Sequence, residues 1–334
     1  MFDDKKILIT GGTGSLGQAL TKKLLQHDVK TIRIISRNEN KQIEMENLFD
    51  DDRLRFFLGD INDFNRLVRA TEDIDIVFHA AALKHVPKIE YNPFEAIKIN
   101  VIGSQNIIDA CLKTNVEKAV CVSTDKAVSP LNTYGATKLL MEKLFVTANN
   151  YTDPKKHPTK FIGLRYGNVV GSSGSVIPKF IEQLKNKNKI TITDPEMTRF
   201  SITMDDALDF ILKATNIGQG SEIFIPKLKS YRIRDVKNSL TELLGDYGEN
   251  IVGIRPGEKL HETLINKEEI RNAWEFKGLY MLTSPLYPMF HPNIIDETYE
   301  GIQQIKNMDV YSSDNVDKIS KEELKNIVQE SNLI

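Results

Sequence analysis

Two pairs of side chains that could transfer protons lie in one short stretch, V-S-T-D-K-A-V-S-P-L-N-T-Y-G-A-T-K (residues 122–138). Tyr134 and Lys138 are one helical turn apart, so on a helix they share a face. A neighbouring ammonium lowers the pKa of a tyrosine from its ordinary value of about 10 and favours the phenolate, which accepts a proton. Just upstream, Asp125 and Lys126 place an acid beside a base. The spacing predicts hydride-transfer chemistry at Tyr134, with two further groups for proton transfer.

Both pairs also have an ordinary structural interpretation. A Tyr-x-x-x-Lys spacing occurs incidentally on helices, and Lys126 alone fits a surface loop. The catalytic interpretation therefore depends on the elements that position these residues.

Short apolar runs alternate with helical patterns through the first half of the chain. Predicted strands cover residues 5–10, 31–36, 54–58, 74–79, 118–123 and 160–166. These runs are apolar enough to be buried on both faces of a sheet, and strand–helix alternation is typical of parallel sheets. The pattern predicts an α/β protein with a Rossmann-like, doubly wound parallel sheet.

The strand–helix rhythm ends after Asn168, which predicts a smaller mixed α/β lobe for substrate binding. We assign residues 1–167 and about 201–228 to the nucleotide-binding domain. The lobe is assigned residues 168–200 and about 229–334, and beyond about residue 284 the pattern weakens.

A glycine-rich turn, I-T-G-G-T-G-S-L-G, follows the first predicted strand and opens a helix. Gly11, Gly14 and Gly17 have the T-G-x-x-G-x-x-G spacing. Glycine lets the backbone turn tightly and approach a pyrophosphate, which binds at the positive N-terminus of the helix. In this position the motif predicts a dinucleotide site in preference to an ordinary turn.

The end of the second strand bears on the choice of cofactor. An NAD enzyme usually has a carboxylate here for the ribose 2′-hydroxyl, whereas this chain has Arg37, preceded by Ser36 and followed by Lys41. A guanidinium pairs well with a 2′-phosphate, so we favour NADP over NAD. The alternative is a solvated basic helix start, and Glu39 weakens the positive charge.

The third and fourth strands end in residues that suit the rest of a dinucleotide. Asp60, followed by Ile61, is placed to accept a hydrogen bond from the adenine amino group. Small residues at 80–82, all alanine, leave room beside the sheet, although they also simply pack well.

Several motifs together resemble the extended short-chain dehydrogenase/reductases: T-G-G-T-G-S-L-G, S-R-N-E-N-K-Q, F-H-A-A-A-L-K-H-V-P, S-T-D-K-A and Y-G-A-T-K. A narrower resemblance is to the inverting UDP-N-acetylglucosamine 4,6-dehydratases, which begin pseudaminic acid synthesis. It is carried by L-R-Y-G-N-V-V-G-S-S-G-S-V-I-P, I-T-D-P-E-M-T-R-F and G-I-R-P-G-E-K-L-H-E, and it covers about residues 4–283, with Y-S-S-D-N near the end. Val128 and Ser129 are mild departures from that pattern.

The resemblance implies a role for each catalytic candidate. Tyr134 is expected to take the proton of the sugar 4-hydroxyl as hydride leaves carbon 4, with Lys138 supporting the phenolate. Asp125 is expected to protonate the departing 6-hydroxyl and Lys126 to take the proton from carbon 5. To act as a base Lys126 must be partly neutral, which requires desolvation or nearby positive charge. The expected product is UDP-2-acetamido-2,6-dideoxy-β-L-arabino-hexos-4-ulose.

The resemblance also implies two sets of binding residues. The cofactor set is expected to be Gly11, Thr13, Gly14, Ser15, Leu16, Gly17, Ser36, Arg37, Asn38, Lys41, Asp60, Ile61, Ala80, Ala81, Ala82, Lys84, Asn100, Tyr134 and Lys138. The substrate set is expected to be Lys84, Lys126, Asn168, Ser173, Gly174, Ser175, Val176, Ile177, Arg199, Arg255 and Glu258. Arginines in a loop-rich lobe suit a nucleotide diphosphate, although most arginines lie on solvated loops.

Composition narrows the classes of protein. The net charge of −2 gives no reason to expect binding to nucleic acid or to an anionic membrane. The six histidines lack metal-ligand spacing, so no metal site is expected. No secretory signal or membrane-spanning run is visible, so we expect a cytoplasmic protein.

Three alternatives remain open at this stage. One is a related capsule-type UDP-N-acetylglucosamine 4,6-dehydratase/5-epimerase, a branch that replaces the tyrosine kept here as Tyr134. Another is a nucleotide-sugar 4-epimerase, which has no use for an acid at a leaving hydroxyl. A third is an NADP-sensing module, which usually loses the tyrosine–lysine pair. The resemblance further implies a homo-oligomer.

Overall fold

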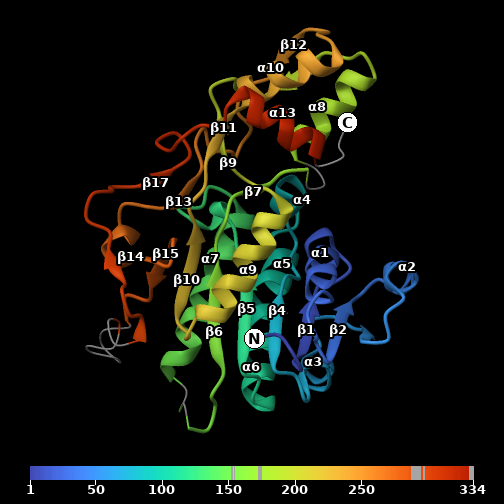
Figure 1. The fold of residues 1–334 in the computed structure, drawn as a ribbon, viewed down its shortest axis with the longest axis vertical. Helices are drawn as coiled ribbons and strands as arrows, with labels where there is room; N and C mark the ends of the chain where they lie inside the picture. The colour runs from blue at the N-terminus through green and yellow to red at the C-terminus, as the bar shows by residue number, and fades with distance from the viewer. Residues whose placement is uncertain (152, 154, 172–174, 287–294, 296–297, 331–334) are drawn as a thin grey trace.

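The computed structural model describes residues 1–334 except 152, 154, 172–174, 287–294, 296–297 and 331–334 (Figure 1). A ten-stranded sheet has the order β16-β14-β15-β10-β6-β5-β4-β1-β2-β3. Its parallel strands are β1 (Lys6–Thr10), β2 (Thr31–Ser36), β3 (Leu54–Leu58), β4 (Ile76–His79), β5 (Lys118–Val122), β6 (Lys160–Leu164) and β10 (Glu222–Pro226). The order β3-β2-β1-β4-β5-β6 is that of a Rossmann fold, which confirms the predicted fold class and the strands predicted from the apolar runs.

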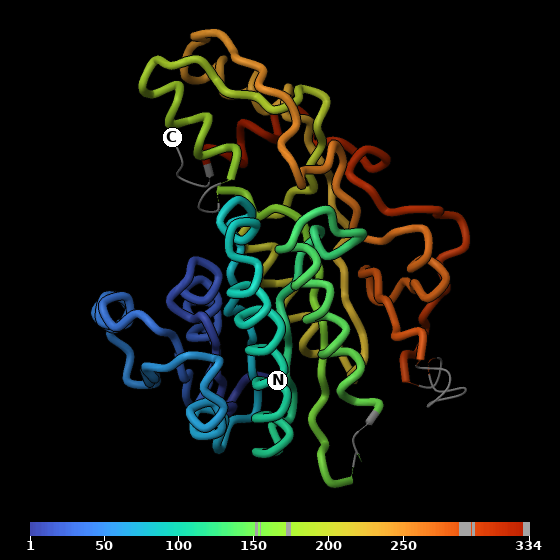
Figure 2. The backbone as a smooth tube through the Cα atoms, turned by 180° about the vertical axis from the view of Figure 1, so that it is seen from behind, coloured from blue at the N-terminus to red at the C-terminus, as the bar shows by residue number. Residues whose placement is uncertain are grey.

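Helices cover both faces of this sheet. They are α1 (Ser15–Leu24), α2 (Glu39–Phe49), α3 (Phe64–Thr71), α4 (Val86–Tyr91), α5 (Pro93–Ile97), α6 (Gly103–Thr114), α7 (Thr133–Ala148) and α9 (Met204–Ile217). On one face, Leu20 of α1 and Ile211 of α9 pack in a core with Ile9 of β1. Figure 2, which is turned by 180° from Figure 1, presents the other face of the sheet. There α3, α6 and α7 cover the sheet, and Met141 of α7 packs with Leu8. The sheet is therefore buried on both faces, as its apolar strands require.

A smaller lobe lies beyond the carboxyl ends of the parallel strands (Figure 1). It contains α8 (Val176–Lys185), α10 (Ile233–Leu244), α13 (Lys321–Glu330), β7 (Asn168–Val169), β8 (Ile190–Ile192), β9 (Thr198–Ile202), β11 (Ser230–Arg232) and β12 (Glu249–Ile251). Phe180 of α8, Leu240 of α10 and Leu324 of α13 pack together in its core. Residues near the C-terminus thus complete the lobe.

The structure divides the chain differently from the predicted boundaries after residue 229. β14 (Ala273–Phe276) and β15 (Leu279–Thr283) form an antiparallel hairpin that continues the main sheet from β10, and β16 (Gln303–Gln304) pairs with β14. Lys277 and Gly278 both have positive φ, of 48° and 76°, as a tight two-residue hairpin turn requires. These strands therefore belong to the nucleotide-binding sheet, although the sequence analysis placed them in the lobe.

Candidate active site

The glycine-rich turn follows β1 and leads into α1, as predicted. Gly11 has a φ of 68°, and a Cβ on it would lie 2.8 Å from Cα of Ala81. A Cβ on Gly17 would lie 2.4 Å from Cα of Gly12, so α1 approaches the turn this closely only with glycine there. Gly14 is the N-cap of α1 and has no capping side chain, and the first turn has no acidic residue. The backbone N–H groups at the start of α1 therefore fit the pyrophosphate of a dinucleotide.

The other residues predicted for this turn lie where a dinucleotide would pass. Thr13 is in the turn, and its carbonyl oxygen accepts a hydrogen bond of 3.1 Å from the side chain of Gln18. Ser15 and Leu16 begin α1. Their contacts with a cofactor stay predictions.

Arg37 and Asp60, which were predicted to contact different parts of the cofactor, contact each other. The distance between Arg37 Nη1 and Asp60 Oδ2 is 3.6 Å. They follow β2 and β3, whose ends lie side by side, and the side chain of Arg37 remains 59% exposed. An exposed pair of this kind contributes little to stability, so Arg37 is available to an anionic ligand.

Three neighbouring candidates have local structural roles. Asn38 caps α2, because its Oδ1 accepts a hydrogen bond of 3.0 Å from the backbone N–H of Lys41. The side chain of Gln42 donates a hydrogen bond of 3.0 Å to Ser36 Oγ. Ile61 is buried in the core beside α6. These contacts shape the edge of the site and leave direct cofactor contacts as predictions.

The loop after β4 is held by Asn100, which lies in a π-helix at Lys98–Ile102. The fully buried amide of Asn100 accepts a hydrogen bond from the backbone N–H of Leu83 and donates to the carbonyl oxygen of Leu83 and to Thr137 Oγ1. Asn100 therefore positions residues 80–84 against α7. Lys84 is exposed in the same loop.

Tyr134 and Lys138 lie in the first half of α7, and both are buried. Burial raises the pKa of Tyr134 to about 12, and the charge of Lys126 together with a hydrogen bond to Thr124 opposes that rise. Burial lowers the pKa of Lys138 to about 8, and its Nζ donates a hydrogen bond of 2.6 Å to the carbonyl oxygen of Val122. The expected support of the Tyr134 phenolate thus comes from Lys126 and Thr124, while Lys138 contacts the end of β5.

Asp125 and Lys126 form a close ion pair in a 3₁₀ helix, Asp125–Ala127, that follows β5. Asp125 is fully buried, and its Oδ1 accepts hydrogen bonds from Thr124 Oγ1 at 2.8 Å and from Lys126 Nζ at 2.9 Å. Within the part of the chain that the structure describes, Asp125 Oδ2 is buried without a partner. The acid and base predicted from the sequence are therefore in direct contact.

Lys126 is held by oxygens from two further elements. Its Nζ lies 3.5 Å from Asn168 Oδ1 of β7 and 3.5 Å from Glu262 Oε1. Burial alone would lower the pKa of Lys126, but the carboxylates of Asp125 and Glu262 raise it above its ordinary value. These contacts favour the ammonium form of Lys126 at rest, so the partly neutral form that a base requires depends on the loss of a proton to a neighbouring group.

A cavity of about 300 Å³ lies between the main sheet and the lobe, and Lys126 lines it. Other predicted substrate residues that line it are Asn168, Ser175, Val176, Arg199, Arg255 and Glu258. Ile177 is instead buried in the core of the lobe. Ser173 and Gly174 lie outside the described residues.

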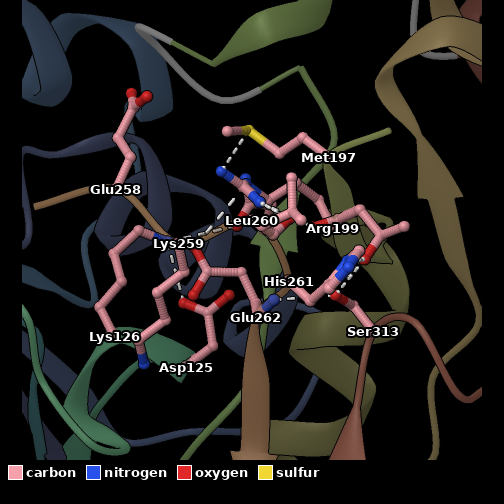
Figure 3. Close-up of polar contacts among 12 residues, drawn as sticks. Asp125, Lys126, Met197, Arg199, Glu258, Lys259, Leu260, His261, Glu262 and Ser313 are labelled. Atoms are coloured by element: carbon pink, nitrogen blue, oxygen red, sulfur yellow. Dashed lines mark hydrogen bonds and ion pairs between the residues drawn. The ribbon is translucent and has the colours of Figure 1, made fainter. Parts of the chain in front are cut away.

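Arg199 is largely enclosed by protein (Figure 3). Its Nη1 donates hydrogen bonds to the carbonyl oxygens of Thr198 and Leu260, and its Nη2 contacts the sulfur of Met197. Its Nε lies 3.7 Å from Glu262 Oε1. Arg199 therefore supports the cavity wall, and its contact with a diphosphate stays a prediction.

Arg255 is the more exposed of the two predicted arginines. Its Nη1 lies 3.7 Å from Glu258 Oε1, and Glu258 Oε2 also accepts a hydrogen bond from the backbone N–H of Arg255. This loop thus presents a guanidinium to the cavity mouth, held by its own neighbour.

Among the residues that line the cavity and that the sequence analysis missed are Lys259 and Glu262. Lys259 donates a hydrogen bond to the carbonyl oxygen of Val128, next to the 3₁₀ helix Asp125–Ala127. Both residues lie in the quoted motif G-E-K-L-H-E, so that run of charged residues was the available indication. It also missed Thr124, which contacts Asp125.

Ser313, in the Y-S-S-D-N segment, holds the back of the cavity together. Its Oγ lies 2.6 Å from Thr198 Oγ1 and accepts a hydrogen bond of 2.9 Å from the backbone N–H of Glu262. His261 Nδ1 is 2.8 Å from the same Thr198 hydroxyl. The segment begins with β17 (Tyr311–Ser312), which pairs with β13 (Thr263–Ile265). This pairing holds Ser313 against the residues at the back of the cavity.

The described residues contain neither a cluster suited to a metal ion nor a helix suited to crossing a membrane. Among the described residues, no group of three or more histidine, cysteine, aspartate or glutamate side chains is arranged to hold a metal ion. Nor does any helix in the described ranges have the length and apolar character to cross a membrane.

The comparisons with known proteins agree with this geometry. A UDP-N-acetylglucosamine 4,6-dehydratase (inverting) of Campylobacter jejuni subsp. jejuni serotype O:23/36 is 45% identical over 333 residues, 98% of this chain and 98% of the relative. A UDP-glucose 4-epimerase of Rickettsia felis is 38% identical over 335 residues, 98% of this chain and 96% of the relative. The X-ray structure of Pen from Bacillus thuringiensis matches with a TM-score of 0.91 and 38% identity, and the match covers 100% of both chains.

The family model described as polysaccharide biosynthesis protein matches residues 7–284. This span runs from the first strand of the glycine-rich site to the last strand of the hairpin that extends the sheet. The motif-based resemblance to inverting dehydratases is confirmed by the full-length similarity. The chain therefore belongs to the polysaccharide biosynthesis protein family, with the Rossmann-like architecture of the short-chain dehydrogenase/reductases.

Proposed function

We propose that this protein is an NADP-dependent UDP-N-acetylglucosamine 4,6-dehydratase that inverts carbon 5. The observation that carries the proposal is the contact of 2.9 Å between Asp125 Oδ1 and Lys126 Nζ at a cavity close to Tyr134. The inverting dehydratase relative, 45% identical over its full length, supports the substrate and the reaction.

The cofactor site is proposed on the glycine turn and on Arg37. The N–H groups at the start of α1 would hold the pyrophosphate, and Arg37 would pair with a ribose 2′-phosphate. NADP, when bound, would supply a hydride acceptor for carbon 4 and a hydride donor for carbon 6. With a solvent-exchangeable proton added at carbon 5, the reaction would have no net redox change.

Tyr134 takes the proton of the sugar 4-hydroxyl. Its pKa of about 12 in the buried site must fall for this role, and the positive charge of Lys126 and the hydroxyl of Thr124 both act in that direction. Asp125 opposes them, so a proton placed on Asp125 also makes the phenolate easier to form.

Asp125 and Lys126 then carry out the elimination. A proton that passes from Lys126 Nζ to Asp125 Oδ1, across 2.9 Å, leaves a neutral amine beside a carboxylic acid. Lys126 takes the proton of carbon 5, the bond between carbon 6 and its hydroxyl breaks, and Asp125 protonates that hydroxyl, which departs as water. The ion pair is regenerated, so both roles follow from one resting arrangement.

A nucleotide-sugar 4-epimerase is the second candidate, because the Rickettsia felis relative carries that name. An epimerase needs the hydride transfer at carbon 4 but has no leaving hydroxyl to protonate. Asp125 is paired to Lys126 and has one buried oxygen without a partner among the described residues, and it therefore favours the dehydratase.

The decisive experiment is proton NMR of UDP-N-acetylglucosamine deuterated at carbon 4, incubated with the protein and NADP in ordinary water. The expected product is UDP-2-acetamido-2,6-dideoxy-β-L-arabino-hexos-4-ulose with the deuterium at carbon 6. In deuterated water, unlabelled substrate should give a product with deuterium at carbon 5. Formation of a 4-epimer, accumulation of NADPH or couplings of the D-xylo configuration would each contradict the proposal.

Arg37→Asp tests the choice of cofactor. We expect the affinity for NADP, measured by calorimetry, to fall more than tenfold, because a carboxylate beside Asp60 repels the 2′-phosphate. The affinity for NAD, which lacks that phosphate, serves as the control and should change less than threefold. An unchanged affinity for NADP would remove Arg37 from the cofactor site.

We also propose that the protein acts as a homo-oligomer in the cytoplasm and that its product enters pseudaminic acid synthesis. The support is the full-length similarity to the inverting dehydratase. Light scattering of the purified protein tests the assembly.

A further inference from the structure

Glu262 is a buried carboxylate that lines the cavity and that no role assigned so far explains. Glu262 is 3% exposed and immediately precedes β13 in the chain. The backbone on both sides of its side chain is fixed, because its N–H donates to Ser313 Oγ and its carbonyl oxygen accepts from the N–H of Ser313. Burial of a carboxylate is costly unless a cation or a hydrogen-bond donor lies beside it, so the neighbours of Glu262 indicate its role.

One oxygen of Glu262 faces two cations (Figure 3). Glu262 Oε1 lies 3.5 Å from Lys126 Nζ and 3.7 Å from Arg199 Nε. Glu262 Oε2 is buried and, within the described residues, has no hydrogen-bond partner. The carboxylate therefore joins the base of the proposed reaction to the arginine of the lobe and keeps one oxygen free.

The surroundings of Lys126 show why such a tether is needed. The titratable and charged groups that face Lys126 are Asp125, Tyr134, Arg199, Tyr231, Lys259 and Glu262. Lysine has a flexible stem of four carbons, and Asp125 alone, its neighbour in sequence, allows the ammonium to turn about that single contact. Asn168 Oδ1 and Glu262 Oε1 add contacts from β7 and from the segment before β13, so three oxygens from three elements fix Nζ.

We propose that Glu262 is a positioning residue of the dehydration, which holds Lys126 Nζ at the cavity against carbon 5 of the sugar and aligns Arg199 through the same oxygen. The inference rests on the proposed function. Its consequence is selective: Glu262 serves the step at carbon 5 and has no part in the hydride transfer at carbon 4. A small displacement of a reacting group is costly for rate, so the effect belongs to kcat.

The test separates these two steps with UDP-N-acetyl-6-deoxyglucosamine, a sugar that has no 6-hydroxyl to lose. Oxidation at carbon 4 reduces NADP and is followed by absorbance, and exchange at carbon 5 is followed by mass spectrometry in deuterated water. For Glu262→Gln, which keeps the shape of the side chain, we expect carbon 4 oxidation within threefold of wild type and carbon 5 exchange slowed at least tenfold. Turnover of UDP-N-acetylglucosamine should lose kcat at least tenfold, with KM changed less than threefold.

Two further variants complete the design. Glu262→Asp restores the charge on a shorter stem and should recover part of the carbon 5 exchange that glutamine loses. Glu268→Gln is the matched control, because Glu268 is exposed and pairs only with the exposed Arg271 among its described contacts to cations, and it should behave as wild type.

The outcomes are distinguishable. Wild-type exchange at carbon 5 in Glu262→Gln overturns the inference, as does an equal loss of both steps in Glu262→Gln with no recovery in Glu262→Asp. If wild-type protein neither reduces NADP with the deoxy sugar nor dehydrates UDP-N-acetylglucosamine, the proposed function itself fails.

Discussion

Lys126→Arg is expected to reduce dehydration of UDP-N-acetylglucosamine by at least a hundredfold, the loss typical of a missing general base. Arginine keeps a positive charge that pairs with Asp125 and Glu262, so the buried carboxylates retain a cation. A guanidinium does not lose its proton in proteins, and it therefore serves as a partner but not as a base. The product is measured by NMR and the deuterium at carbon 5 by mass spectrometry.

Two controls separate chemistry from folding and binding. Affinity for NADP should stay within threefold of wild type, because Lys126 lies on the substrate side of the site. Lys267→Arg, at an exposed lysine, should keep full activity. Lys126→Ala should also be inactive, and an active Lys126→Arg or Lys126→Ala enzyme would refute the role of Lys126 as the base.

Arg165→Met is expected to lower the free energy of unfolding by about 3–5 kcal/mol, the range for breaking a buried ion pair from one side. The side chain of Arg165 is 1% exposed and lies between Glu142 of α7 and Glu269, with distances of 2.6 Å and 2.9 Å from its Nη2. Its Nη1 also donates to the carbonyl oxygen of Leu264 in β13. Removing the cation leaves the fully buried carboxylate of Glu142 without this partner.

Urea unfolding of matched variants tests this prediction. Arg165→Met combined with Glu142→Met should be more stable than Arg165→Met alone, because it also removes the stranded carboxylate. Arg271→Met, at an exposed ion pair, should change the free energy of unfolding by less than about 1 kcal/mol. A loss at Arg165 as small as the loss at Arg271 would show that the buried network contributes nothing to stability.

The nucleotide-binding half was predictable because its determinants are local. The first three residues of β4 (Ile76–His79) are apolar, and a run of apolar residues that is buried on both faces is typical of a parallel sheet. Gly17 is required by its close approach to Gly12, five residues earlier in the same turn. One turn of α7 likewise sets the spacing of Tyr134 and Lys138.

The electrostatics of the site were not predictable, because they depend on residues distant in sequence. Lys126 and Asp125 are adjacent in the sequence, but the sequence does not reveal that Glu262, which precedes β13, also lies beside Lys126 and adds to the effect of Asp125 in raising its pKa. Nor does the sequence indicate that Asn100, predicted as a cofactor residue, forms hydrogen bonds with Leu83 and Thr137. A pKa is set by the sum of burial and all nearby charges, and a sequence gives only the charges that are neighbours along the chain.

The boundary between the two parts of the chain was decided by tertiary structure as well. The hairpin of β14 and β15 has short strands, and only the free edge of β10 determines that Ile223 pairs with Leu282 and that the main sheet continues. The roles of Tyr311 and Ser313 were likewise set by tertiary contacts. Tyr311 lies in the strand that pairs with β13, and Ser313 forms hydrogen bonds with Thr198 and Glu262. The sequence by itself determined the fold class, the glycine turn and the candidates for the reacting groups, since these follow from local pattern. Tertiary structure decided which groups hold them, because pairing across a sheet edge and the approach of distant charges depend on the folded arrangement of the whole chain.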